Sequence, residues 1–220
     1  MIFVGNGALL WRAVAHAKEA GQPVDLVVTG PGAHHQDPAA VDTHDVNAVA
    51  QDIDAASSDG IIWSIDNAFV FRAPVLELDQ QIYNVHGGPL PAYRGLPLAT
   101  VAHALLNDEP EYGATLHHVD AGLDTGPVID ERRFPIAPDD VFEDVMLATI
   151  DACHELFVDN LDDVAAGRCT PRPQPDGPSG YYGLHAARQL DRHRDNPHYA
   201  RATDLGLFAD FYPEAAAAWS

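Results

Sequence analysis

Apolar residues alternate along the first half of the chain between short continuous runs and stretches with a helical period. The continuous runs predict four buried strands, at residues 1–4, 24–29, 60–64 and, for the fourth, up to Asn84. The apolar positions that follow Gly7, and those at 46–56, recur with the spacing of helices. Because strands alternate with helices, the pattern favours an α/β fold with a doubly wound, mostly parallel sheet.

The second half continues this pattern up to a proline-rich segment. A helix is predicted at 97–106, two strands at 113–119 and 128–135 flank a turn, and a long helix starts near Asp140 and ends at Gly167. Residues 30–42 read as a loop because they are rich in proline, glycine and histidine.

Four prolines and two glycines lie within residues 171–180, which indicates a boundary. We therefore expect a main domain over residues 1–175 and a short C-terminal extension over residues 176–220. The extension packs back on the core, covers a substrate site or forms a homodimer interface, and the sequence does not choose among these. Because the boundary precedes it, we expect the main domain to fold without it.

Charge and hydropathy narrow the classes of function. The chain has 220 residues, and 33 acidic against 12 basic residues give a formal net charge of −21. Such a charge repels a phosphate backbone, so binding to nucleic acid is disfavoured. No window approaches 18 consecutive apolar residues and no signal peptide is recognisable, so we expect a cytoplasmic protein without a membrane contact.

Two weaker readings concern cofactors. The turn Gly5-Asn6-Gly7 matches only half of the dinucleotide-binding fingerprint, because Leu10 stands where the third glycine belongs. A metal site at His34-His35 or His117-His118 is disfavoured, since adjacent side chains on a strand point apart and no third ligand has suitable spacing. We therefore predict no metal.

The stretch that follows the fourth strand has the strongest chemical pattern. Asn84 and His86 are two residues apart at the carboxyl end of that strand, where open α/β sheets bind ligands, and a loop rich in proline and glycine follows. With Asp124, they combine an oxyanion donor, a proton-transfer group and a carboxylate that can orient an imidazole. These side chains suit acyl transfer, although loop Asn, His and Asp are also common turn formers and caps.

The motifs Asn84-Val85-His86-Gly87-Gly88-Pro89-Leu90-Pro91-Ala92-Tyr93-Arg94-Gly95, Tyr112-Gly113-Ala114-Thr115-Leu116-His117 and Asp120-Ala121-Gly122-Leu123-Asp124-Thr125-Gly126 carry a resemblance. Together they resemble the core signature of the formyltetrahydrofolate-dependent formyltransferases. This family includes methionyl-tRNA formyltransferase, glycinamide ribonucleotide transformylase and sugar N-formyltransferases. The resemblance is strong over residues 82–135 and loose over 1–182, and it implies the Rossmann-like formyltransferase fold.

The resemblance implies roles for individual residues. Asn84, His86 and Asp124 fall on the family's catalytic Asn, His and Asp, and 10-formyltetrahydrofolate would be the cosubstrate. His117 and Thr115 fall on positions that shape the site. The pterin would contact two segments of backbone, formed by Ala68, Phe69, Val70 and Phe71 and by Val119, Asp120, Ala121 and Gly122.

The resemblance leaves the formyl acceptor open. The chain reaches Ser220 without room for the C-terminal domain that methionyl-tRNA formyltransferase uses on tRNA, and its charge opposes tRNA as well. We therefore expect the amine or hydroxylamine of a small molecule, such as an amino sugar or an amino acid, to accept the formyl group. The alternatives are a formyltetrahydrofolate hydrolase, formylation of a carrier-bound aminoacyl group, a non-catalytic folate-binding protein and an enzyme that binds a dinucleotide at the N-terminal turn.

Overall fold

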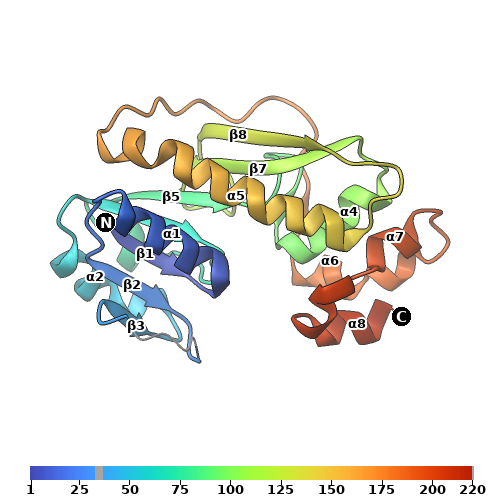
Figure 1. Cartoon of the computed structure of the whole chain (residues 1–220), viewed down its shortest axis with the longest axis horizontal. Helices are drawn as coiled ribbons and strands as arrows, with labels where there is room; N and C mark the ends of the chain where they lie inside the picture. The colour runs from blue at the N-terminus through green and yellow to red at the C-terminus, as the bar shows by residue number, and fades with distance from the viewer. Residues whose placement is uncertain (33–36, 220) are drawn as a thin grey trace. The chain divides into compact units, whose positions relative to one another are not determined.

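The computed structural model describes residues 1–32 and 37–219, and its largest element is a seven-stranded sheet (Figure 1). The strand order is β3-β2-β1-β4-β5-β7-β8. The strands are β1 (Ile2–Gly5), β2 (Leu26–Thr29), β3 (Ala40–Asp42), β4 (Ile61–Ile65), β5 (Gln81–His86), β7 (Glu111–His118) and β8 (Val128–Pro135). The first five in this order pair in parallel, as the alternation of strands and helices predicts. The fold is therefore α/β with a mixed, mostly parallel sheet.

Helices and short 3₁₀ turns connect the strands. They are α1 (Gly7–Glu19), η1 (Val46–Val49), α2 (Ala50–Ala56), α3 (Ala73–Leu76), α4 (Pro97–Leu106), α5 (Phe142–Ala165), α6 (Leu184–Arg188), η2 (Leu190–His193), α7 (Tyr199–Thr203), η3 (Gly206–Asp210) and α8 (Pro213–Trp219). A second sheet joins β6 (Arg94–Gly95) in parallel to β9 (Tyr181–Tyr182). None of the helices in the described part of the chain is long and apolar enough to span a membrane.

The residues group into two compact units. Unit 1 contains Met1–His86, Leu116–Asp130 and His154–Pro173, and unit 2 contains Gly87–Thr115, Glu131–Cys153 and Gln174–Ser220.

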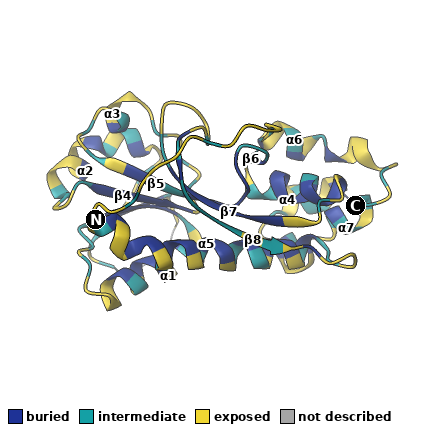
Figure 2. Cartoon of the chain, turned by 90° about the horizontal axis from the view of Figure 1, so that it is seen from above, coloured by how far each residue is buried: buried dark blue, intermediate teal, exposed yellow. Residues whose placement is uncertain are grey.

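In unit 1, alternate side chains of the strands pack on opposite faces of the sheet. Ile2, Val4 and Ile62 face η1, α2 and α3 in one buried cluster. Phe3 and Trp63, one position along, meet Phe157 of α5, with ring centroids 6.0 and 4.8 Å from its ring. Figure 2 shows α2 and α3 on one side of β4 and β5, with α1 and α5 on the other. The doubly wound arrangement thus follows from the two-residue period of these strands.

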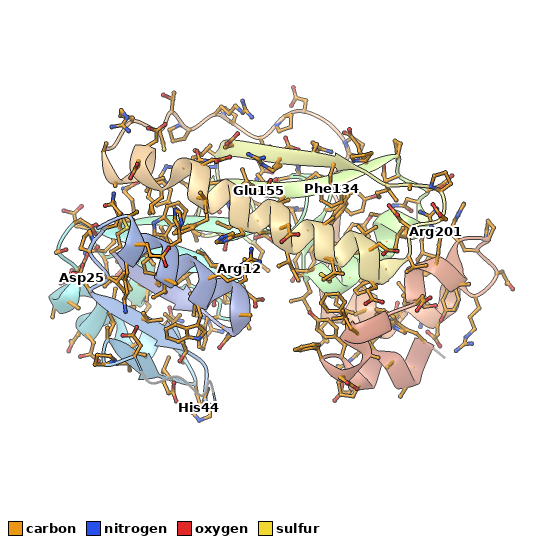
Figure 3. All side chains as sticks on the ribbon, in the orientation of Figure 1. Arg12, Asp25, His44, Phe134, Glu155 and Arg201 are labelled. Atoms are coloured by element: carbon orange, nitrogen blue, oxygen red, sulfur yellow. The ribbon has the colours of Figure 1, made fainter. Side chains whose placement is uncertain are left out.

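Unit 2 has its own core, to which the C-terminal residues contribute. Val101 and Leu105 of α4 and Phe142 of α5 are fully buried in it. The same cluster contains Ala187, Leu190, Ala202, Leu205, Phe208 and Trp219. Polar contacts add to this packing: Arg201, labelled in Figure 3, donates from Nε to the Asp140 carbonyl over 3.0 Å. Residues beyond the proline-rich segment are therefore part of a core.

The structure corrects several element boundaries expected from the sequence. The segment 30–42 is not loop throughout, because β3 forms within it and pairs with β2. The fourth strand does not end at Asn84 but continues to His86. Residues 73–76 form α3, with Pro74 in its first turn, where a missing N–H costs little. These elements are short and depend on contacts made by the folded chain.

Candidate active site

The three predicted polar residues lie together in unit 1. Asn84 and His86 are both on β5, two residues apart, so their side chains leave the same face of the strand. Asp124 lies between β7 and β8, and its Oδ2 is 3.8 Å from Nδ1 of His86. His86 is only 5% exposed. This separation lies within ion-pair range, and catalytic groups are often this far apart before a substrate binds.

His117 joins this group from β7. Its Nε2 lies 3.0 Å from Nδ2 of Asn84 and 3.7 Å from Oδ1 of Asp124, and its side chain is 2% exposed. Its Nδ1 lies 2.8 Å from the carbonyl oxygen of His118. Since a carbonyl only accepts, Nδ1 carries the proton, and the lone pair of Nε2 accepts a hydrogen bond from Asn84. His117 thus shapes the group by holding the Asn84 amide.

The amide of Asn84 is oriented on both edges. Its Oδ1 accepts a hydrogen bond of 2.7 Å from the Ser64 hydroxyl, and its Nδ2 donates to His117. An amide nitrogen carries two hydrogens, so Nδ2 has a second N–H to donate. A fixed amide N–H beside an imidazole and a carboxylate is able to stabilise a developing oxyanion and move a proton.

The turn that carries Asp124 is braced by its own side chains. Oδ1 of Asp120 accepts hydrogen bonds from the Gly122 N–H over 2.9 Å and from the Thr125 hydroxyl over 2.6 Å. A Cβ on Gly122 would lie 2.0 Å from Oγ1 of Thr125, so a larger residue there would displace the hydroxyl that bonds Asp120. Asp124 itself has φ of 54°, a left-handed conformation that Asp and Asn adopt more readily than other non-glycine residues. The backbone therefore fixes the position of this carboxylate.

The two segments expected to contact a pterin contain residues that pack on one buried cluster of unit 1. Phe69 and Phe71 of the first segment, and Val119 of the second, contact that cluster. Val70 remains 48% exposed, and its carbonyl accepts a hydrogen bond of 2.9 Å from Nδ2 of Asn47. The first segment, with Ala68, has no regular secondary structure. The second, with Ala121, ends in the turn that carries Asp124.

The loop after His86 is held by buried hydroxyl donors of unit 2. Tyr112 donates to the Gly87 carbonyl over 3.1 Å, and Thr115 donates to the Gly88 carbonyl over 2.8 Å. Both side chains are almost completely buried. The loop that glycine and proline predict is thus a fixed one.

Gly87 gives a direct test of how closely this loop is packed. A Cβ at Gly87 would lie 3.0 Å from Cγ2 of Thr149 and 3.5 Å from Cγ of Pro97. We expect Gly87→Ala to lower the free energy of unfolding by about 1–3 kcal/mol, as overpacking does. Thermal and urea unfolding would measure it.

Two variants control this prediction. Thr149→Ser removes the methyl group that the new Cβ meets and keeps the hydroxyl that donates to the Val145 carbonyl over 2.7 Å. It should therefore restore most of the lost stability in the Gly87→Ala background. Gly177→Ala should change little, because no atom lies within 4 Å of the added Cβ. If the Gly87→Ala protein is as stable as the parent, the loop moves to accommodate the added methyl group and the prediction is wrong.

The structure describes one of the two histidine pairs considered for metal binding. His117 holds Asn84, whereas the His118 ring packs on Tyr83 with centroids 4.7 Å apart. Burial, with the neighbouring His117, lowers the pKa of His118. The pair His34-His35 lies outside the described residues. Within 1–32 and 37–219, no group of three or more His, Cys, Asp or Glu side chains could hold a metal ion.

Ser64 is a member of the site that the sequence prediction did not include. It is the only polar residue of β4, whose sequence is Ile61-Ile62-Trp63-Ser64-Ile65. A serine in an otherwise apolar buried strand was a signal that it has a polar partner. Identifying that partner as Asn84 requires the register of β4 against β5.

Comparison with known families gives a match over most of the chain. Residues 11–161 match the family described as formyl transferase. A methionyl-tRNA formyltransferase from Acidothermus cellulolyticus is 39% identical over 92 residues, which cover 42% of this chain and 28% of that protein. One from Roseiflexus is 33% identical over 140 residues, covering 63% and 39%. The chain thus matches well under half the length of these curated relatives.

Solved structures share the fold at lower identity. A 4-N formyltransferase from Francisella tularensis superposes with a TM-score of 0.72 at 19% identity, covering 86% of this chain and 78% of that one. An N-formyltransferase from Helicobacter canadensis, in complex with folinic acid and dTDP-3-aminofucose, gives 0.69 at 20% identity, covering 84% and 71%.

Proposed function

We propose a function from one premise: the chain belongs to the formyl transferase family. In this proposal the protein moves a formyl group from 10-formyltetrahydrofolate to the amine or hydroxylamine of a small molecule. The observation that carries it is the arrangement of Asn84, His86, His117 and Asp124 in unit 1, with Asn84 and His86 on one face of β5.

The proposed reaction passes through a tetrahedral intermediate. The acceptor amine attacks the formyl carbon, and the carbonyl oxygen becomes an oxyanion. The second N–H of Asn84 and the protonated His86 stabilise that charge. Asp124 orients His86, and its carboxylate attracts the protonated imidazole across 3.8 Å. The amine loses a proton and N10 of tetrahydrofolate gains one as the C–N10 bond breaks.

The folate is proposed to contact Ala68–Phe71 and Val119–Gly122 through backbone groups. Ala68–Phe71 follows β4 at the carboxyl edge of the parallel strands, where α/β folds bind ligands. Val119–Gly122 follows β7, where the Val119 N–H donates to the Ile82 carbonyl of β5 over 2.9 Å, and it leads into the turn that carries Asp124. Val70, exposed within the first segment, supplies apolar surface. The folinic acid complex of the Helicobacter canadensis relative supports a reduced folate as the cosubstrate.

A small-molecule acceptor is proposed because of the charge of the chain. A net charge of −21 opposes the phosphate backbone of a tRNA. The Helicobacter canadensis relative was crystallised with an amino sugar nucleotide, dTDP-3-aminofucose, which makes amino sugars the first class to test.

Two measurements test the proposal. Calorimetry with 5-formyltetrahydrofolate should detect binding by the folded protein. Incubation with 10-formyltetrahydrofolate and a panel of dTDP-3-aminofucose, free amino acids and hydroxylamine should release tetrahydrofolate, and one acceptor should gain the mass of one formyl group. An absence of heat with the folate would contradict the proposal. Formate released without any amine would instead identify a hydrolase.

A further inference from the structure

A series of hydrogen bonds runs toward Asn84 from the segment proposed to hold the pterin. It begins at the backbone N–H of Phe69, which donates to Oδ1 of Asn67 over 2.8 Å. Since a backbone N–H only donates, this bond fixes which edge of the Asn67 amide carries the oxygen. Nδ2 of Asn67 then donates to Oγ of Ser64 over 3.0 Å and lies 3.3 Å from the Phe69 carbonyl.

The hydrogen bond from Asn67 also determines how Ser64 bonds to Asn84. Its oxygen accepts from Asn67, so its own hydrogen points to Oδ1 of Asn84, 2.7 Å away. The two residues are direct partners in the parallel register of β4 and β5. Ser64 is 1% exposed, so water does not compete for its hydroxyl.

The other end of the series requires the same orientation. The His118 carbonyl accepts from Nδ1 of His117, which leaves Nε2 of His117 to accept from Asn84. A flipped Asn84 amide would put its oxygen against that lone pair and turn its N–H groups toward Ser64. The hydrogen-bond donors and acceptors that are fixed at both ends of the series therefore require the same orientation of the Asn84 amide.

We infer that Ser64 and Asn67 are positioning residues, which set the amide of Asn84 so that an N–H faces the reacting carbonyl. This inference rests on the proposed function. It also links two parts of the site: whatever fixes the backbone at Phe69 fixes Asn84 through three side-chain hydrogen bonds. Neither Ser64 nor Asn67 touches the reacting atoms.

The kinetic test is a double-mutant cycle, run with the acceptor of highest turnover in the panel. Ser64→Ala should lower kcat by about ten- to a hundredfold, the scale of a misplaced catalytic group, and leave the Kd for 5-formyltetrahydrofolate within about twofold. In an Asn84→Ala background the same change should have almost no further effect, since coupled residues are not additive. Full additivity would overturn the inference, because a purely structural Ser64 would add its loss.

Two further variants sharpen the result. Asn67→Asp keeps the acceptor for the Phe69 N–H but offers Ser64 a carboxylate, which draws its hydroxyl away from Asn84. It should mimic Ser64→Ala. Ser57→Ala is the matched control: it removes a hydroxyl that bonds Gln80 over 2.7 Å at the other end of β4, and kcat should not change.

A spectroscopic measurement makes the test independent of the acceptor. The side-chain amide cross-peaks of Asn84, assigned by their loss in Asn84→Ala, should shift in Ser64→Ala and Asn67→Asp and stay in place in Ser57→Ala. Unmoved peaks would overturn the inference. If Asn84→Ala transfers formyl groups as fast as the parent, the proposed function fails instead, so the two failures are distinguishable.

Discussion

Replacing Asp124 by asparagine should lower formyl transfer by about a hundredfold or more while folate binding persists, as expected for loss of a general acid/base group. The substitution removes the charge that lies 3.8 Å from His86 and 3.7 Å from His117. It does not disturb the backbone, because Asn adopts the left-handed conformation of this position as readily as Asp does. Initial rates of tetrahydrofolate release, measured at several pH values, would show the loss even if the titration of His86 moved.

The chain offers a matched control for this variant. Asp108 has the same φ of 54° and lies in the turn that follows α4 in unit 2. Its contacts are an exposed hydrogen bond of 3.4 Å to Arg201 and a separation of 3.7 Å from His198. Asp108→Asn should therefore leave turnover unchanged. If Asp124→Asn is equally harmless, Asp124 is a turn former only, and its catalytic role is wrong.

Deleting residues 181–220 should prevent unit 2 from folding. The deletion removes several buried apolar side chains from its core, among them Leu190, Phe208 and Trp219. At about 1.5–3 kcal/mol for each large side chain, the lost burial is on the order of 10 kcal/mol, comparable to the stability of a whole domain. Soluble yield, circular dichroism and thermal unfolding would measure the effect. A truncated protein that unfolds cooperatively at the parent temperature would support the earlier expectation that the main domain folds alone.

A pair of point variants separates packing from length. Trp219 is 3% exposed, and its Nε1 donates to the Ala187 carbonyl over 3.0 Å. Trp219→Ala should lower the free energy of unfolding by ~3–5 kcal/mol. Phe211, eight residues earlier, is 72% exposed, so Phe211→Ala should cost far less. Equal losses would mean that the buried face of the extension is not what stabilises unit 2.

The parallel sheet was predictable because its strands are buried on both faces. Runs such as Ile61-Ile62-Trp63 in β4 are too apolar for loop and too short for helix, so their pattern identifies them. The strands β3 and β9 were not predictable in this way. They contain three and two residues, and only their neighbours in the folded chain make them strands.

The residues of the site also differ in whether the sequence alone predicts them. Asn84 and His86 were predictable because the two-residue period of a strand and its position before a proline-rich loop are properties of adjacent residues. Asp124 was grouped with them for its carboxylate, and the family resemblance implied its catalytic role. The link from Asn67 through Ser64 to Asn84 was not predictable, because it depends on which strands are neighbours and in what register. The family resemblance implies only a shaping role for His117, and its contact with Asn84 makes that role specific.

The small sheet of β6 and β9 affects the order in which parts of the protein fold during synthesis. The Arg94 N–H donates to the Gly180 carbonyl over 3.0 Å, and the Leu96 N–H donates to that of Tyr182 over 2.9 Å. These partners are synthesised 86 residues later. When His86 and its loop leave the ribosome, the backbone that pairs with the far end of that loop has not yet been made. Contacts of such long sequence separation form late in folding. A nascent chain can therefore complete β1 to β5 before the far end of the loop after His86 has its strand partner, which is present only once Tyr182 has emerged.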